Sequence, residues 1–144
     1  MSATTASTVV HGTRKTLAQQ LVALSRMPIT SNVTIKRGRL QWRGELQPSP
    51  VSRTFTLRMT YDGGHRTPAV TVVRPQLRTE DVQDLPHVYP GDELCLCYPI
   101  EWDAGQLIAR TIIPWASEWL LHFEIFVATG RWHGGGHEPA VPGR

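Results

Sequence analysis

Cys95 is the residue of this chain best suited to chemistry, because it follows a polar segment that contains ionisable side chains. His87 lies earlier in that segment, and Asp92 and Glu93 lie close to the cysteine. A thiolate in such a setting can carry an acyl group, since a thioester transfers its acyl group more easily than an oxygen ester does. The residues alone also allow a second interpretation, in which Cys95 is an inert buried cysteine.

His87 is the second candidate for a catalytic residue. A histidine within hydrogen-bond reach of a thioester can donate to its oxyanion, or it can remove a proton from the incoming nucleophile. The sequence does not separate these two roles. A third interpretation is that the imidazole only makes hydrogen bonds to the backbone of its own loop.

A zinc site is the strongest alternative from another class of protein. His133 and His137 are separated by three residues, and Cys95 and Cys97 offer two thiolates. Zinc ligands are usually spaced more widely than Cys-x-Cys, and such a pair on a strand directs its side chains to opposite faces. We therefore expect neither a metal nor another cofactor. A non-catalytic module that binds protein, nucleic acid or a nucleotide is a further alternative. For a nucleotide, the glycine run 134–136 lacks the Lys-Ser or Lys-Thr of a phosphate-binding loop.

Length and composition favour one intracellular domain. A chain of 144 residues can bury a core without disulfides. Residues 1–8 are small and polar, unlike a secretory signal, and no apolar run is long enough to span a membrane. We therefore expect a cytoplasmic protein with reduced cysteines and no membrane contact. The formal charge is +3, and the basic cluster 36–39 is typical of a solvated strand pair, so we expect no binding to nucleic acid.

The spacing of apolar residues predicts the elements of the N-terminal half. Residues 14–26 have the helical period, and Met27-Pro28 ends that helix. Alternation of apolar and polar residues predicts strands within 34–46 and 54–61, and an apolar run predicts a third strand at 69–73. Together these strands make an antiparallel meander.

The second half is expected to hold a functional loop and a long helix. Residues 78–94 are polar and irregular, and long ordered loops usually carry function. Residues 103–110 are short enough for a single helical turn. A C-terminal helix follows, with Thr111 as N-cap, Pro114 in the first turn and Gly130 at the end.

The predicted fold class is therefore α+β, with one domain over residues 13–133. Residues 1–12 are expected to form a flexible tail, and residues 134–144 a glycine-rich tail. Trp115 and Trp119 lie four residues apart on the apolar stripe of the C-terminal helix, which predicts that both belong to the core.

The remaining aromatic residues near the predicted loop are also assigned to packing. Tyr89 and Tyr98 flank Cys95, and Trp102 follows the loop. We interpret all three as packing residues rather than as catalytic groups.

The segment 85–96 resembles the cysteine loop of ubiquitin-conjugating (UBC-like) enzymes. In that loop a His-Pro-Asn tripeptide precedes a Val-Tyr-Pro turn and a cysteine with aliphatic neighbours. Set without gaps, residues 88–90 match the turn and Cys95 falls on the thioester cysteine. Leu85 replaces the histidine of the tripeptide, and His87 replaces the asparagine whose amide supports the oxyanion.

A closer resemblance is to the small stand-alone UBC-like proteins of bacterial type II CBASS antiphage operons, encoded beside a cGAS/DncV-like nucleotidyltransferase. Four pieces carry the resemblance, and it is strong only from about residue 68 onward. They are residues 86–99, residues 111–120, residues 128–132 and residues 134–139. Cys97 departs from the pattern, since an aromatic residue is expected there.

This resemblance implies a UBC-like fold and a cysteine acyltransferase. It implies that Cys95 forms a thioester with the C-terminus of the nucleotidyltransferase and transfers it, which primes antiphage cyclic-nucleotide signalling. His87 would then act in the transfer step. No adenylating domain fits in the chain, so the activated acyl group is expected from elsewhere. The sequence leaves open whether an activating enzyme in trans supplies it or the partner is captured in another way. The acceptor is not identified by the sequence.

Overall fold

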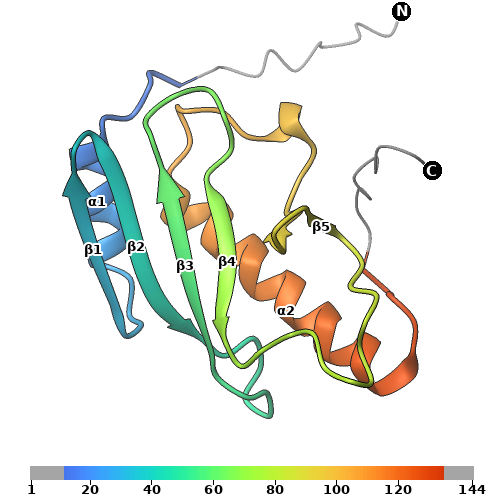
Figure 1. The fold of residues 1–144 in the computed structure, drawn as a ribbon. Coiled ribbons are helices and arrows are strands. Elements are labelled where there is room, and N and C mark those ends of the chain that lie inside the picture. The colour runs from blue at the N-terminus through green and yellow to red at the C-terminus, as the bar shows by residue number, and fades with distance from the viewer. Residues whose placement is uncertain (1–11, 135–144) are drawn as a thin grey trace, which may run out of the picture.

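The computed structural model describes residues 12–134, and these residues form an α+β fold. A four-stranded antiparallel sheet packs against helices α1 and α2, which lie on the same face of the sheet (Figure 1). The predicted order of helix, antiparallel meander, cysteine loop and helix is confirmed. Most of both predicted tails lies outside the described residues, so the proposed domain boundaries remain predictions.

Helix α1 spans Leu17–Ser25 and begins with a capping box. The Thr16 hydroxyl accepts from the Gln19 amide at 3.1 Å, and the Gln19 side chain accepts from the Thr16 amide at 2.8 Å. These two bonds satisfy amides that have no partner within the helix, so the helix begins at this cap rather than at residue 14. Gln20 is buried. Its side-chain amide donates a hydrogen bond to the Gln106 carbonyl and accepts one from the Ile108 backbone amide. These two hydrogen bonds tie α1 to the segment before α2.

The sheet has the strand order β1-β2-β3-β4, with every neighbouring pair antiparallel. The strands are β1 Ser31–Lys36, β2 Arg39–Leu46, β3 Phe55–Tyr61 and β4 Ala69–Arg74. The alternating pattern predicted one strand within 34–46, which is wrong, because a hairpin divides this segment. Arg37 and Gly38 form its turn with φ of 53° and 71°, the left-handed pair that a two-residue hairpin requires.

The predicted loop 78–94 contains a short hairpin, with β5 at Val88–Tyr89 and β6 at Glu93–Leu94. Gly91 and Asp92 turn the chain between them with positive φ. The Asp92 carboxylate accepts a bifurcated hydrogen bond from the single Arg78 Nε–H, with its two oxygens at 2.9 and 3.0 Å, and a further bond from Nη2 at 2.8 Å. These bonds hold the tip of the hairpin against the start of the loop.

Two 3-10 turns, Pro99–Glu101 and Ile108–Arg110, lead into helix α2, which spans Ile112–Thr129. Gly130 ends α2 in the left-handed conformation, as predicted, with its amide donating to the Phe126 carbonyl at 2.8 Å. None of the helices described is both long and apolar enough to cross a membrane.

The predicted capping role of Thr111 is corrected by the structure. Thr111 occupies the N-cap position of α2, but its side chain makes no capping bond. Instead its hydroxyl donates to the Leu107 carbonyl at 2.9 Å and accepts from the Trp102 indole at 3.2 Å. Trp102 is buried, so its assignment to packing is confirmed.

Candidate functional site

The backbone of the β5–β6 hairpin brings Cys95 and His87 together. Cys95 directly follows β6, and its amide donates to the His87 carbonyl at 3.0 Å. His87 directly precedes β5 and has a φ of 53°, a conformation that a non-glycine residue rarely adopts. The sequence predicted that these two residues share a site, and the structure places both of them at one end of the hairpin.

Helix α2 fixes the same end of the hairpin through Trp119. The buried Trp119 indole donates its N–H to the His87 carbonyl at 3.0 Å, so that this carbonyl accepts two hydrogen bonds. Trp119 also stacks on Phe123 with ring centroids 5.7 Å apart. The predicted core position of Trp119 is confirmed. Its hydrogen bond to the His87 carbonyl also holds the loop against α2.

Trp132, which follows α2, covers the site from the C-terminal side. Its ring centroid lies 4.9 Å from that of His87, 5.2 Å from that of Trp119 and 5.9 Å from that of His122. The chain then passes closely over these rings at Gly134, where a Cβ atom would come within 2.6 Å of the His122 ring. A side chain at position 134 would therefore displace the aromatic cover.

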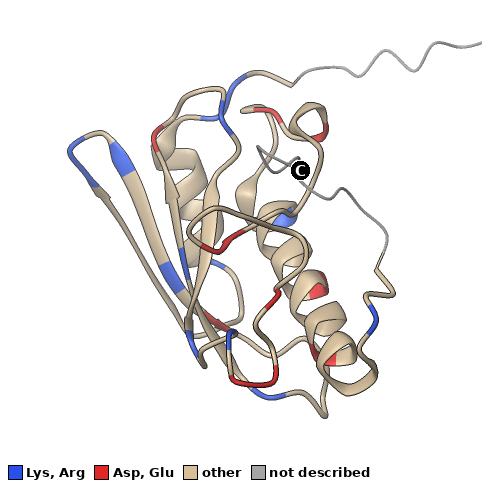
Figure 2. Ribbon diagram, turned by 45° about the vertical axis from the view of Figure 1, so that its right-hand side comes forward, with Lys and Arg blue, Asp and Glu red and all other residues tan. Residues whose placement is uncertain are grey.

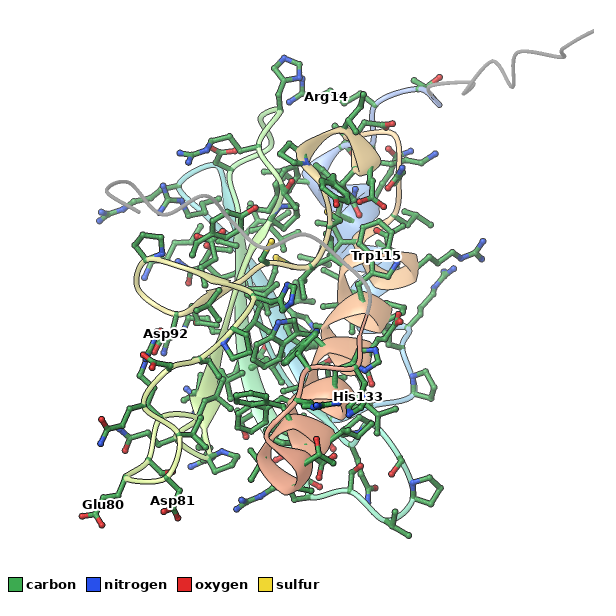
Figure 3. All side chains as sticks on the ribbon, turned by 90° about the vertical axis from the view of Figure 1, so that its right-hand side faces the viewer. Arg14, Glu80, Asp81, Asp92, Trp115 and His133 are labelled. Carbon is green, nitrogen blue, oxygen red and sulfur yellow. The ribbon has the colours of Figure 1, made fainter. Side chains whose placement is uncertain are left out.

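A cavity of about 300 Å³ opens beside Cys95, between the loop and α2. Figure 3 labels Asp92 on the loop and Trp115 on α2. Trp115 is half-buried and packs against the core, as predicted, and it also lines this cavity. The residues around the cavity come from three segments. They are His87, Cys95, Leu96, Cys97, Tyr98 and Glu101 from the loop and first 3-10 turn, Trp115, Glu118, Trp119 and His122 from α2, and Trp132.

The surroundings of Cys95 act on its thiol in opposite directions. Burial raises the pKa of the Cys95 thiol above its ordinary value, and the charge of Glu93 raises this pKa further. A hydrogen bond from the Tyr89 hydroxyl to the sulfur lowers it. Tyr89 is therefore more than the packing residue that the sequence suggested, because it stabilises the thiolate form of Cys95.

The second cysteine is held in the thiol form. Burial, the negative charge of Glu101 and the neighbouring Cys95 raise the pKa of Cys97 to about 11, although a hydrogen bond with Thr67 lowers it. A thiol with that pKa is almost entirely protonated at neutral pH and is a poor nucleophile. Cys97 lines the same cavity as Cys95.

A second histidine reaches the cavity from α2. His122 Nε2 lies 3.6 Å from Glu118 Oε1, one helical turn away. Its Nδ1 atom is shielded from solvent and has no hydrogen-bond partner in the described part of the chain. His87 and His122 therefore place two imidazoles around the cavity that Cys95 also lines, and an imidazole can accept or donate a proton near neutral pH.

Sequence reasoning missed the contribution of α2 to this site. Trp115, Glu118, Trp119 and His122 follow the i, i+3, i+4, i+7 spacing, which places them on one face of a helix. The helical spacing is visible in the sequence, but only the packing of α2 against the loop shows that this face of the helix lines the cavity beside Cys95. The side chains of α2 include two carboxylates and no Lys or Arg, and Figure 2 shows these acidic positions along the helix.

Within residues 12–134, no three or more His, Cys, Asp or Glu side chains gather closely enough to hold a metal ion. His137, one member of the alternative zinc set, lies outside the described residues. The arrangement around Cys95 instead combines a thiol, a hydroxyl donor and two imidazoles beside a cavity. These groups suit acyl transfer through a thioester.

Comparison with known proteins agrees with the fold and with the resemblance of the loop. No curated protein matches the chain. A family model described as "Type II CBASS E2 protein" matches residues 19–139, which include most of α1, the sheet, the cysteine loop and α2. The chain therefore belongs to the family of E2-like proteins of type II CBASS operons.

Proposed function

We propose that this protein carries the C-terminal acyl group of the cGAS/DncV-like nucleotidyltransferase of its operon as a thioester on Cys95. It then transfers that group to an acceptor and so primes antiphage cyclic-nucleotide signalling. The observation that carries the proposal is the position of Cys95, which the hairpin and α2 hold at the side of a cavity next to two histidines. Membership of the CBASS E2 family supports the identity of the partner.

Loading requires an activated carboxylate. The Cys95 thiolate attacks the carbonyl carbon of the activated C-terminus, the C–S bond forms, and the activating group leaves with the electrons of its own bond. An activating enzyme in trans, which forms an acyl-adenylate from ATP, supplies that substrate. The Tyr89 hydroxyl promotes this step, because it stabilises the attacking thiolate.

The transfer step requires the site to stabilise a negative charge rather than a thiolate nucleophile. Attack on the thioester places negative charge on the carbonyl oxygen, and a positioned hydrogen-bond donor stabilises that charge. We assign this role to His87, whose side chain lines the cavity and whose backbone is hydrogen-bonded to Cys95. His87 then supports transfer more than loading.

The test is a comparison of the two cysteines. The whole operon is expressed with Cys95→Ala or Cys97→Ala, and covalent adducts of the nucleotidyltransferase are separated on gels with and without a reductant. We expect a reductant-sensitive adduct that disappears in Cys95→Ala and persists in Cys97→Ala. An adduct that survives Cys95→Ala but is lost in Cys97→Ala would reverse the assignment.

A further inference from the structure

The face of the sheet that points away from α1 and α2 is hollowed and basic. Both helices lie on the other face (Figure 1), and a hollow of about 710 Å³ crosses this open face over all four strands. The side chains of the open face that line the hollow are Asn32 and Thr34 from β1, Gln41, Arg43 and Glu45 from β2, Thr56, Arg58 and Thr60 from β3, and Arg74 from β4. Three of these side chains are cations, and one is a carboxylate.

The strand register places two of the arginines directly opposite each other. Arg43 of β2 pairs with Arg58 of β3, so their side chains project from the same face with Cβ atoms about 4.5–5.5 Å apart. Both side chains are exposed, in the alternating pattern of their strands. Asn32 of β1 lies opposite Arg43 on its other side. Arg74 pairs with Thr56, and its Nε donates to the Thr56 hydroxyl at 3.4 Å.

The stability of the sheet does not explain this pair of arginines. Like charges that lie directly opposite each other destabilise an antiparallel pair of strands. Within the described residues, neither Arg43 nor Arg58 forms an ion pair that would offset the repulsion. Two adjacent guanidinium groups instead suit a ligand with several anionic oxygens, because the planar donor fork of arginine matches a phosphate group. The pair therefore indicates a surface that binds an anion.

The side chains around the pair indicate which kind of anion. Interfaces with proteins usually depend on large aromatic anchors, and single-stranded nucleic acid is bound by stacking its bases on aromatic rings. Among the described residues that line the hollow, the aromatic one is Trp42, and its side chain is buried. Arg, Thr, Asn and Gln are the side chains that contact the phosphates of a duplex. The lining therefore favours a duplex over a protein or a single strand.

The basic character continues from the hollow to the tip of the β1–β2 hairpin. Arg39 lies four residues before Arg43 on the same face of β2, about 13 Å away along the strand. Lys36 pairs with Arg39, and Arg37 lies in the turn beside them. Figure 2 shows Lys and Arg positions at this hairpin and along its strands. A row of this length spans about four nucleotides of one strand of a duplex.

We infer that the open face binds duplex nucleic acid through its phosphate backbone, without reading the base sequence. Arg43 and Arg58 are the central contacts, and Arg74 and the hairpin cations extend them. This differs from the expectation drawn from composition, because the sequence shows the cluster 36–39 but not that the sheet brings Arg58 and Arg74 beside β2. The inference goes beyond the proposed function and needs no thioester on Cys95.

The test measures binding at several salt concentrations. Purified protein is titrated into a short fluorescein-labelled duplex, and anisotropy gives the association constant at each concentration of sodium chloride. A plot of its logarithm against the logarithm of the salt concentration should be linear, with a slope of about −0.9 for each phosphate neutralised. Arg43→Gln and Arg58→Gln should each make the slope shallower by about 0.9, which weakens binding about eightfold at about 0.1 M salt.

Two further variants test whether position or net charge matters. Arg110→Gln is the matched control, because it removes the same charge from an exposed arginine on the second 3-10 turn, near α1. It should leave the slope unchanged. Glu45→Gln removes the carboxylate from the hollow and should tighten binding. Circular dichroism checks that each variant is folded, so that a loss of binding reflects the surface.

Three other ligands complete the test. A duplex of unrelated sequence should bind equally well, and a single strand of the same length should bind more weakly. Poly-L-glutamate represents an acidic protein surface, and it should not displace the duplex at an equal concentration of charge. The inference is overturned if the protein does not bind the duplex at low salt, if Arg43→Gln and Arg110→Gln weaken binding equally, or if the single strand or poly-L-glutamate binds more tightly than the duplex.

Discussion

Removal of the Tyr89 hydroxyl should slow the reactions of Cys95 at neutral pH. The pKa of Cys95 lies above its ordinary value because of burial, and the Tyr89 hydrogen bond opposes this shift. At neutral pH the thiolate is therefore the minor form, and its fraction rises as the pH approaches the pKa. Tyr89→Phe keeps the ring but removes the hydrogen bond, so the pKa of Cys95 rises further and the thiolate fraction falls.

Two opposing changes set the reaction rate of Cys95 in Tyr89→Phe: the thiolate fraction falls, and the nucleophilicity of each thiolate rises. A hydrogen bond to a charged group contributes about 1.5–3 kcal/mol, and we take about 1 kcal/mol because Tyr89 is half-exposed and sulfur is a weak acceptor. That energy corresponds to a roughly fivefold smaller thiolate fraction. Each remaining thiolate becomes about twice as nucleophilic, because nucleophilicity rises with pKa with a Brønsted slope of about 0.4–0.5. The net expectation is a rate about two- to threefold lower.

The assay is the rate of alkylation by iodoacetamide between neutral and strongly alkaline pH, with Cys97→Ala present throughout so that one thiol reacts. Tyr89→Phe should be slower at neutral pH and about twofold faster once Cys95 is fully ionised, so the two pH profiles should cross. Glu93→Gln removes a charge that raises the pKa, and its neutral rate should rise. Equal profiles for Tyr89→Phe and the parent would refute the role of this hydroxyl.

Substitutions at two further positions, His87 and Trp119, test the loop. In His87→Ala, loaded protein should accumulate and its discharge to an amine should fall about a hundredfold, because one oxyanion donor is lost, whereas His87→Asn should retain more activity. Normal discharge with blocked loading would assign His87 to the activation of Cys95. Trp119→Phe keeps the stacking but removes the hydrogen bond to the His87 carbonyl at 3.0 Å, and should lower the free energy of unfolding by about 1 kcal/mol in a denaturant titration. Unchanged stability would mean that this bond does not hold the loop.

Local patterns allowed most of the fold to be predicted. The 3.6-residue period and Gly130 define α2 closely, since both signals depend on short-range geometry. The β1–β2 hairpin was missed, because its turn places Arg37 where asparagine or glycine is usual. Alternation continues across a two-residue turn, so periodicity alone does not reveal the division.

The sequence allowed prediction only of those site residues that lie close together along the chain. Cys95 and His87 share one loop, and the resemblance of that loop indicated both residues. Glu118 and His122 are distant in sequence, and they reach the cavity because α2 packs against the hairpin and Trp119 bonds to it. Tyr89 was assigned to packing because a tyrosine in a turn gives no sign in the sequence that its hydroxyl meets a sulfur atom.

The central claim is that Cys95 carries the nucleotidyltransferase by its C-terminus. The most direct measurement is the mass of the intact adduct isolated from cells that express the whole operon, followed by peptide mapping without a reductant. We predict a mass equal to the two chains less one water, with the C-terminal peptide of the nucleotidyltransferase joined to the peptide that contains Cys95. A linkage to Cys97 or to a lysine of this chain, or no covalent species with intact Cys95, would contradict the account.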